Sequence, residues 1–311
     1  MGDESSRTVA VALAANVCVA ATKLVAAVLT GSTALLAEAT HAVADVGNQL
    51  LLLVAQRRSR RPGDERHPFG YGREAYFWAL IASVGVFVAG AAFSLREGIS
   101  ELMNPVAGAS FVAVYVVLGV CLLADAVSLR QSSRQLRSEA DSLHRDFLDQ
   151  VDLTSDPTVR AVFVEDATAI AGDLIALAGI ALHQVIGSSV PEGVAAVLIG
   201  VLLVAVGVQL ARRNHDFLLG EQAQPAAKER VRAYLLSVPG VLAVRELLVT
   251  FTGPRQVWVL ARVDVEDSLR GGDVERLVRD LESGLEGRSR YITRVDVVPI
   301  GGEGPVGSSP P

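Results

Sequence analysis

The chain has 311 residues, of which 50% are hydrophobic and 20% are charged, and its formal net charge at neutral pH is −6. The acidic balance gives no support for a nucleic-acid partner, because binding to a phosphate backbone depends on an excess of basic side chains. Only two cysteines occur, so neither a disulfide framework nor a cysteine-rich metal site is expected. Apolar residues gathered into long runs indicate a membrane protein.

Six apolar segments are long enough to cross a bilayer, which takes about 20 residues each. They cover residues 8–30, 33–55, 76–94, 110–129, 158–185 and 190–210. The predicted architecture is therefore an all-α bundle of six transmembrane helices. The helical pattern of the fourth segment continues through "SLRQSSRQLRSEADSLHRDFLDQ", and "TSDPT" is expected to begin the fifth span.

Basic residues are unevenly distributed between the connections, and this bias sets the orientation. Arginines crowd the second and fourth connections and the segment after the sixth span. The first, third and fifth connections, "TGST", "GISELMNPVAGAS" and "HQVIGSSVPEG", contain no Lys or Arg, and Arg96 at the outer edge of the third span is the one exception to the bias. Both termini are therefore predicted to be cytoplasmic. The start "MGDESSR" is acidic, so a cleaved signal peptide is not expected. The lack of an evident targeting peptide favours the cell membrane as the location of this multi-pass protein, whose spans would contact its lipid.

The long apolar runs of the sequence end near residue 219. "PAAKERVRAYLLSVPG" and "GGDVERLVRDLESGLEG" have helical patterns, whereas "LLVTFTG", "QVWVLARVDVE" and "YITRVDVVPI" alternate as strands do. We predict a six-span domain over residues 1–218 and a cytoplasmic α+β domain of ferredoxin-like α-β-β-α-β order over residues 219–300. The remaining residues, 301–311, are rich in Gly, Pro and Ser and are predicted to be a disordered tail.

Ionisable side chains interrupt two of the apolar spans, where charges are costly. His41 and Asp45 are four residues apart in the second span, and Glu38 precedes His41 by three, so all three share one helix face. An imidazole with carboxylates on one face supplies half of a site for a divalent metal. The fifth span can supply the other half, because it carries three acids, Glu165, Asp166 and Asp173.

A structural interpretation competes with the metal site. A single acid such as Glu38 can serve as the partner of a polar neighbour, or as a proton relay beside the ligands. Lys23, a basic residue inside the first span, can extend its amine to the membrane edge or pair with one acid. Asn16 in the first span and Lys23 are further candidates for a proton relay or for a contact beside the ligands, and Asp125 in the fourth span either relays protons or faces cytoplasmic water. A bound cation is the simplest counter-charge for the remaining acids.

Several motifs together resemble the cation diffusion facilitator family. "GSTALLAEATHAVAD" is similar to the second-span signature of that family, and "HPFGYGREAYFWALIASVGVFVAGAAFSLREGI" is similar to its third-span motif. "DPTVRAVFVEDATAIAG" resembles the zinc transporter nine-like branch, in which the fifth span carries adjacent Glu and Asp residues. The resemblance covers residues from about 8 to 300.

The resemblance implies a homodimer that exports a divalent metal, commonly zinc, from the cytoplasm in exchange for protons, and it implies no bound cofactor. His41 and Asp45 match the family's second-span ligands. Placing Gly172 on a family glycine puts Asp166 on the usual aspartate, but the usual histidine is replaced by Val162. Asp166 is therefore the first candidate for the fifth-span ligand. The other two candidates, in descending order, are Glu165 and Asp173.

This departure leaves alternatives open. A site richer in carboxylate favours harder ions, so export of Mn2+ or Fe2+ is the alternative to Zn2+. A membrane metal sensor or scaffold that does not transport is a second alternative. An intramembrane zinc protease would be expected to carry H-E-x-x-H, which does not occur in the sequence, so a secondary transporter is favoured over an enzyme.

Overall fold

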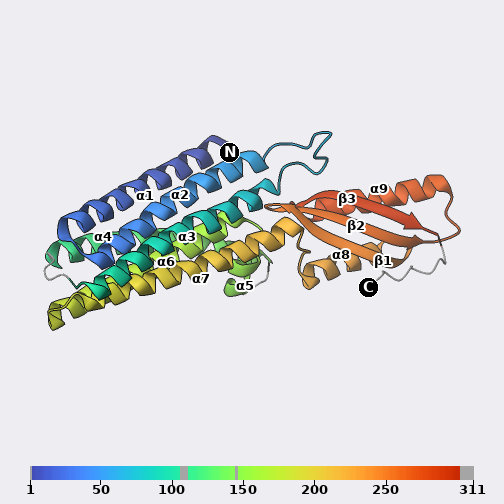
Figure 1. The fold of residues 1–311 in the computed structure, drawn as a ribbon. Coiled ribbons are helices and arrows are strands. Elements are labelled where there is room, and N and C mark those ends of the chain that lie inside the picture. Colours follow the sequence, from blue (N-terminus) through green and yellow to red (C-terminus); the bar gives the residue numbers. More distant parts are fainter. Residues whose placement is uncertain (1, 106–110, 144–145, 302–311) are drawn as a thin grey trace. The chain divides into compact units, whose positions relative to one another are not determined.

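The computed structural model describes residues 2–105, 111–143 and 146–301, and its fold is drawn in Figure 1. The chain forms two compact units. The first contains residues 1–61 and 74–215, and the second contains residues 62–73 and 216–311. The predicted tail lies almost wholly outside the described residues.

The first unit is built from long helices. The described part of the chain contains six helices of 27 to 33 residues: α1 (Gly2–Thr30), α2 (Thr33–Ser59), α3 (Glu74–Met103), α4 (Phe111–Leu143), α6 (Pro157–Ile186) and α7 (Val190–Leu219). At 1.5 Å per residue the shortest extends about 40 Å, which exceeds a hydrocarbon core of about 30 Å. Every segment predicted to span lies within one of these helices, apart from residue 110, which is outside the described residues.

Four of the helices, α3, α4, α6 and α7, are long and apolar enough to cross a membrane by length and composition, within the described residues. The helix α2 is less apolar because it carries Glu38, His41, Asp45, Asn48 and Gln49. The structure thus confirms the predicted helices, while a count of six membrane crossings stays a prediction.

Local sequence signals mark where these helices begin and end. The Ser32 side chain accepts a hydrogen bond from the amide of Leu35 at the start of α2, and Asp156 caps α6 ahead of a proline in the first turn. Gly187 ends α6 in the left-handed region, with φ of 74°. "TSDPT" therefore begins the fifth long helix of the chain as predicted.

The end of the fourth long helix differs from the sequence prediction. The helix of the fourth span continues past the apolar segment, as expected, but α4 ends at Leu143. Residues Phe147–Leu153 form a separate short helix, α5, whose first turn is capped by the carboxylate of Asp146. An aspartate ahead of an apolar residue is a common signal for the start of a helix. The helical pattern continues on both sides of Asp146, so the sequence analysis did not recognise the break between α4 and α5.

Apolar side chains of the first unit are arranged for two different environments. Small and branched residues such as Ala37, Leu118, Ile180 and Leu203 form its buried core. Large apolar residues along α4 are instead more than 60% exposed and recur every three or four residues: Val112, Val116, Val120, Leu123 and Val127. An exposed apolar stripe of this length suits contact with lipid.

The second unit combines two helices with a three-stranded sheet. Its elements are α8 (Pro225–Ser237), β1 (Val241–Gly253), β2 (Gln256–Val265), α9 (Gly271–Arg288) and β3 (Ile292–Ile300). The strand order is β1-β2-β3, with β1 antiparallel and β3 parallel to β2, so α9 is the crossover between parallel strands. The predicted α-β-β-α-β order is confirmed.

The loop between α2 and α3 belongs to the second unit. The ring of Phe69 lies 5.0 Å from that of Trp258 on β2, and the Arg294 guanidinium on β3 lies 5.1 Å from the centre of the Phe69 ring. A Cβ at Gly72 would lie 2.5 Å from the carbonyl oxygen of Thr252, so this position accepts only glycine. Residues 62–73 therefore pack as part of the α+β unit.

Candidate functional site

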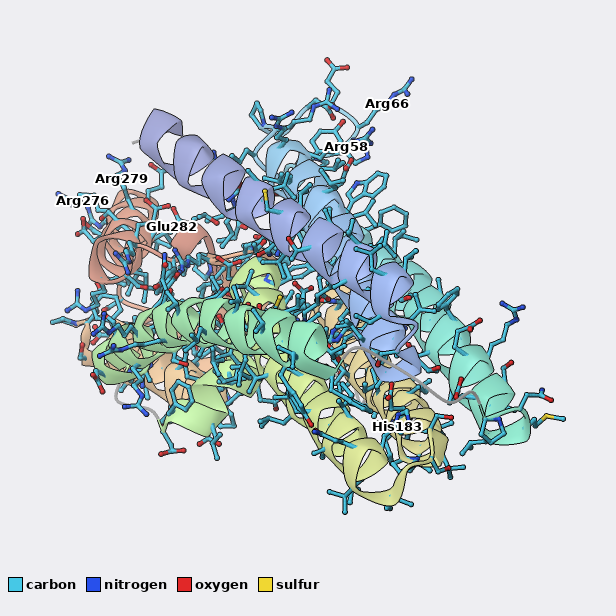
Figure 2. All side chains as sticks on the ribbon, turned by 90° about the vertical axis from the view of Figure 1, so that its left-hand side faces the viewer. Arg58, Arg66, His183, Arg276, Arg279 and Glu282 are labelled. Carbon is cyan, nitrogen blue, oxygen red and sulfur yellow. The ribbon has the colours of Figure 1, made fainter. Side chains whose placement is uncertain are left out.

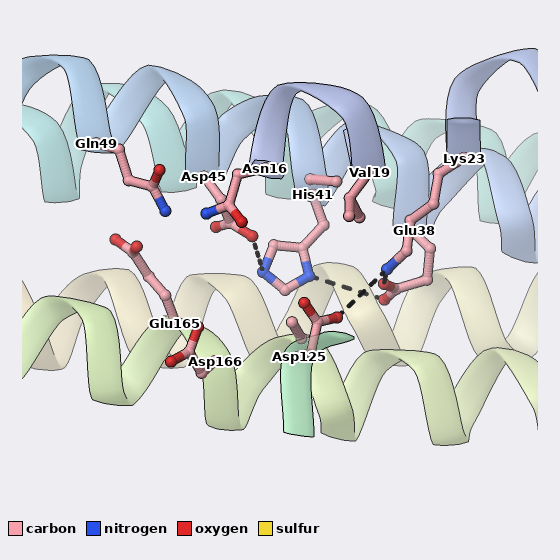
Figure 3. Close-up of a pocket in the computed structure, with 12 residues that line it drawn as sticks. Asn16, Val19, Lys23, Glu38, His41, Asp45, Gln49, Asp125, Glu165 and Asp166 are labelled. Atoms are coloured by element: carbon pink, nitrogen blue, oxygen red, sulfur yellow. Dashed lines mark hydrogen bonds and ion pairs between the residues drawn. The ribbon is translucent and has the colours of Figure 1, made fainter. Parts of the chain in front are cut away.

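A polar pocket lies among four helices of the first unit, α1, α2, α4 and α6 (Figure 3). Of the site residues predicted from the sequence, all but Asp173 line it. The lining consists of Asn16, Val19, Lys23, Glu38, His41, Ala42, Asp45, Gln49, Asp125, Glu165, Asp166 and Ala169. Residues separated by up to about 150 positions in the sequence thus meet in one place.

The imidazole of His41 lies in the middle of the α2 stripe. It is 1% exposed, with Nδ1 3.7 Å from Glu38 Oε1 and Nε2 3.4 Å from Asp45 Oδ2. Both contacts are longer than a good hydrogen bond, and neither ring nitrogen has a hydrogen-bond partner in the described structure. The predicted shared face of Glu38, His41 and Asp45 is observed.

Adjacent acids on α6 have different surroundings. Asp166 accepts hydrogen bonds at Oδ2 from Ser128 (2.8 Å) and Ser132 (3.3 Å), both on α4. Glu165 is 3% exposed, and both of its carboxylate oxygens are without a hydrogen-bond partner among the residues that the structure describes. Figure 3 shows the Glu165 carboxylate extending from α6 toward the α2 residues Asp45 and Gln49.

Lys23 differs most from what the sequence suggested. Its side chain does not extend to the membrane edge, because the residue is 1% exposed. The ammonium lies 2.6 Å from Asp173 Oδ1, 3.1 Å from Glu38 Oε2 and 3.9 Å from Asp125 Oδ2. It therefore faces three acids from three helices, whereas the sequence offered either extension to the membrane edge or pairing with one acid. Part of the counter-charge that we assigned to a bound cation is supplied by the chain itself.

The remaining candidates have distinct positions. Asp173 is fully buried and does not line the pocket itself, but it accepts a hydrogen bond from Lys23, which does. The Asp125 side chain, 15% exposed, faces the pocket and Lys23, and Asn16 lies beside Asp45 in Figure 3. No group of three or more His, Cys, Asp or Glu residues within the described ranges is close enough to hold a metal ion as the side chains stand. Ligation would therefore require side-chain movement.

Two features were missed by the sequence analysis. Ser128 follows Asp125 by three residues and Ser132 follows Ser128 by four, so their shared helix face was detectable. Near the end of α6, the buried His183 (Figure 2) has Nδ1 2.5 Å from Glu192 Oε1, and Ser32 donates a hydrogen bond to the other oxygen of Glu192. This network joins the ends of α2, α6 and α7, and no periodic pattern indicates it.

Taken together, the long apolar helices, the exposed apolar residues along α4 and the buried polar pocket define an integral membrane protein. Comparison with known proteins gives its family. The description "Cation efflux transmembrane domain" matches residues 9–219. The chain belongs to this cation efflux family, the cation diffusion facilitators, as its second- and third-span motifs indicated.

Individual relatives support the branch. The chain is 32% identical over 244 residues to a Xenopus laevis protein named proton-coupled zinc antiporter SLC30A9, mitochondrial, in a match that covers 78% of this chain and 44% of that protein. It is 29% identical over 260 residues to metal tolerance protein C4 of Arabidopsis thaliana, covering 84% of this chain and 57% of that one. The chain thus spans about half the length of these relatives, and the resemblance to the zinc transporter nine-like branch is confirmed.

One solved structure, a single-residue variant of the MamM CTD, aligns with 25% of this chain and 94% of its own, at 22% identity and a TM-score of 0.24. This likeness is too low to assign a fold, so the α+β unit is defined here by its own strand order.

Proposed function

We propose that this protein is a secondary transporter that exchanges a divalent metal cation for protons, with Zn2+ as its cargo. The observation that carries the proposal is a set of buried donor atoms in one pocket of a membrane bundle. Both nitrogens of His41, Oδ1 of Asp45 and both oxygens of Glu165 have no hydrogen-bond partner among the described residues. Buried polar groups are normally paired, so such a set is suited to binding a ligand.

The donor types favour a divalent cation as that ligand. Imidazole and carboxylate are ligands of Zn2+, Mn2+ and Fe2+, and the carboxylate-rich set is harder than one with two imidazoles. Zn2+ is our first choice because relatives of about 30% identity bear the names of zinc antiporters. Mn2+ or Fe2+ is the alternative cargo of the same mechanism.

Proton exchange follows from the chemistry of these ligands. A metal binds deprotonated carboxylate and neutral imidazole, so capture of the cation releases protons and protonation from the other side expels it. In the proposed alternating-access cycle, His41, Asp45 and Glu165 capture the cation, with Asp166 held beside them by its serine contacts. Rocking of the bundle then presents the pocket to the opposite side.

Three further elements complete the proposal. The arginine-rich connections support cytoplasmic termini and six membrane crossings. The proposed direction of transport, out of the cytoplasm, rests on the resemblance to the family. We place the protein in the cell membrane, and we propose that the protomers pair as a homodimer, as in the family that the chain belongs to.

The proposal is tested with purified protein in liposomes that contain a pH-sensitive dye, against a panel of Zn2+, Mn2+ and Fe2+. We expect His41→Ala and Asp45→Ala each to abolish metal-dependent proton movement. Asp149→Asn, which alters an exposed acid on α5, is the control and keeps wild-type flux. Unchanged flux in both pocket variants would reject the site.

Metal binding without flux in the wild-type protein would instead support a sensor or scaffold. Each variant is checked for folding by its elution as a single species in size-exclusion chromatography in detergent. A loss of flux in a folded variant is then attributed to the pocket.

A further inference from the structure

The contacts of Lys23 form a second cluster beside the candidate metal pocket. Glu38 and Asp173 each have one oxygen on the Lys23 ammonium, at 3.1 and 2.6 Å, and both acids are 0% exposed. An ammonium held by buried carboxylates marks the position that a cation prefers, because burial of these acids alone would be strongly unfavourable.

Each of these two acids has a second carboxylate oxygen that does not contact Lys23. Glu38 Oε1 and Asp173 Oδ2 are buried and have no hydrogen-bond partner in the described structure. The backbone is shaped around one of them, since a Cβ on Gly172 would overlap Glu38 Oε1 and lie 3.0 Å from the carboxyl carbon. One ammonium carries a single charge, whereas a divalent cation would bring two and would use the free oxygens as ligands.

The cluster occupies a defined place along the helices. Glu38 precedes His41 by one turn of α2, toward Ser32, and Asp173 follows Asp166 by seven residues of α6, which is about 10 Å along the axis. Both steps lead away from the arginine-rich end of α2. The Lys23 cluster therefore lies on the Ser32 side of His41 and Asp166.

We propose that Glu38 and Asp173 form a second cation site, occupied in this conformation by the tethered ammonium of Lys23, which a divalent cation takes over after leaving His41 and Asp45. This inference rests on the proposed transport function. In it, Lys23 closes the route on the Ser32 side until a cation from the pocket displaces its ammonium. Displacement involves no bond making beyond metal coordination, and the released ammonium is free to pair with Asp125, 3.9 Å away.

The test measures metal bound per subunit in the purified full chain, by equilibrium dialysis with Zn2+ and with Mn2+. Lys23→Met removes the charge and keeps a side chain of similar length, so we expect it to bind an additional divalent ion relative to wild type. Lys23→Arg keeps the charge and is the matched control, with unchanged stoichiometry. The additional ion must disappear when Glu38→Gln and Asp173→Asn are added.

A second measurement covers the case in which Lys23→Met does not fold. Asp173→Asn keeps the Lys23–Glu38 pair, and we expect it to lower the maximal rate of transport several-fold while metal affinity at the pocket is unchanged. A merely structural role would alter both or neither. Wild-type kinetics for Asp173→Asn, or no additional ion in folded Lys23→Met, overturns the inference.

The two proposals fail in different ways. If His41→Ala abolishes metal capture while Lys23→Met gains no ion, the transport site stands and the second site falls. If His41→Ala leaves capture and flux unchanged, the transport proposal itself falls, whatever the Lys23 variants do.

Discussion

Substitution of Gly172 by alanine tests how tightly α6 is fitted to the Lys23 cluster. The added Cβ would overlap Glu38 Oε1 and lie 3.0 Å from its carboxyl carbon, whereas ordinary contacts begin near 3.4 Å. The helix itself tolerates alanine, so the cost arises from this approach alone. Glu38 has a flexible side chain, but it is fully buried and its other oxygen is held by Lys23. Relief of the overlap must therefore weaken that ion pair.

We expect Gly172→Ala to destabilise the first unit by about 1–3 kcal/mol, the usual cost of an overfilled core. The assay is thermal unfolding in detergent, in which the midpoint falls relative to wild type. In a Glu38→Ala background the overlap is absent, so the same substitution should cost almost nothing there. This loss of additivity is the signature of direct contact.

Gly119→Ala is the matched control, because a Cβ at that position of α4 meets nothing within 4 Å. Its stability should equal or exceed that of wild type by up to about 1 kcal/mol. Our description of the cluster is refuted if Gly172→Ala is as stable as Gly119→Ala, or if Glu38→Ala fails to suppress its effect.

Two further predictions concern carboxylates inside and outside the pocket. Asp166→Asn should lower metal affinity by about 10–100-fold, the usual effect of a residue that supports the ligands without binding the metal. Glu165→Gln should lower metal affinity further, because we propose Glu165 as a ligand. Isothermal titration measures both affinities, and the reverse order would restore Asp166 as the ligand. In the loop after α2, the hydrogen bond from the Tyr71 hydroxyl, together with those from the backbone amides of His67 and Arg66, lowers the pKa of Asp64 to about 2. Because the folded pKa is depressed, these contacts stabilise the loop above about pH 4 and are lost as the pH falls toward about 2. Tyr71→Phe should raise that pKa toward its usual value in a carboxyl NMR titration, and an unchanged pKa would contradict the assignment.

Much of the architecture was predictable because it depends on local sequence. The long helices follow from apolar runs, and the strands of the second unit follow from alternation over few residues. The face shared by Glu38, His41 and Asp45 follows from helical spacing alone, and it is observed.

The contacts of Lys23 were not predictable in the same way. Its partners Glu38 and Asp173 are 15 and 150 residues away in the sequence. Whether an amine reaches them depends on how α1 is rotated against α2 and α6, which hydrophobic periodicity within a span does not determine. The same reason explains why the hydrogen bonds that Ser128 and Ser132 donate to Asp166 were missed. The ranking of Asp166 above Glu165 rests on the placement of Gly172 on a family glycine, which carries no information on these contacts.

The packing of residues 62–73 with the C-terminal strands has a consequence for biosynthesis. These residues leave the ribosome early, yet the ring of Phe69 meets Trp258 and Arg294, which are made more than 180 residues later. At about 5–20 residues per second, the loop waits roughly 10–40 s for its complete set of neighbours. The α+β unit therefore cannot mature as an independent late module, and a fragment that starts at residue 216 would lack part of its own surface.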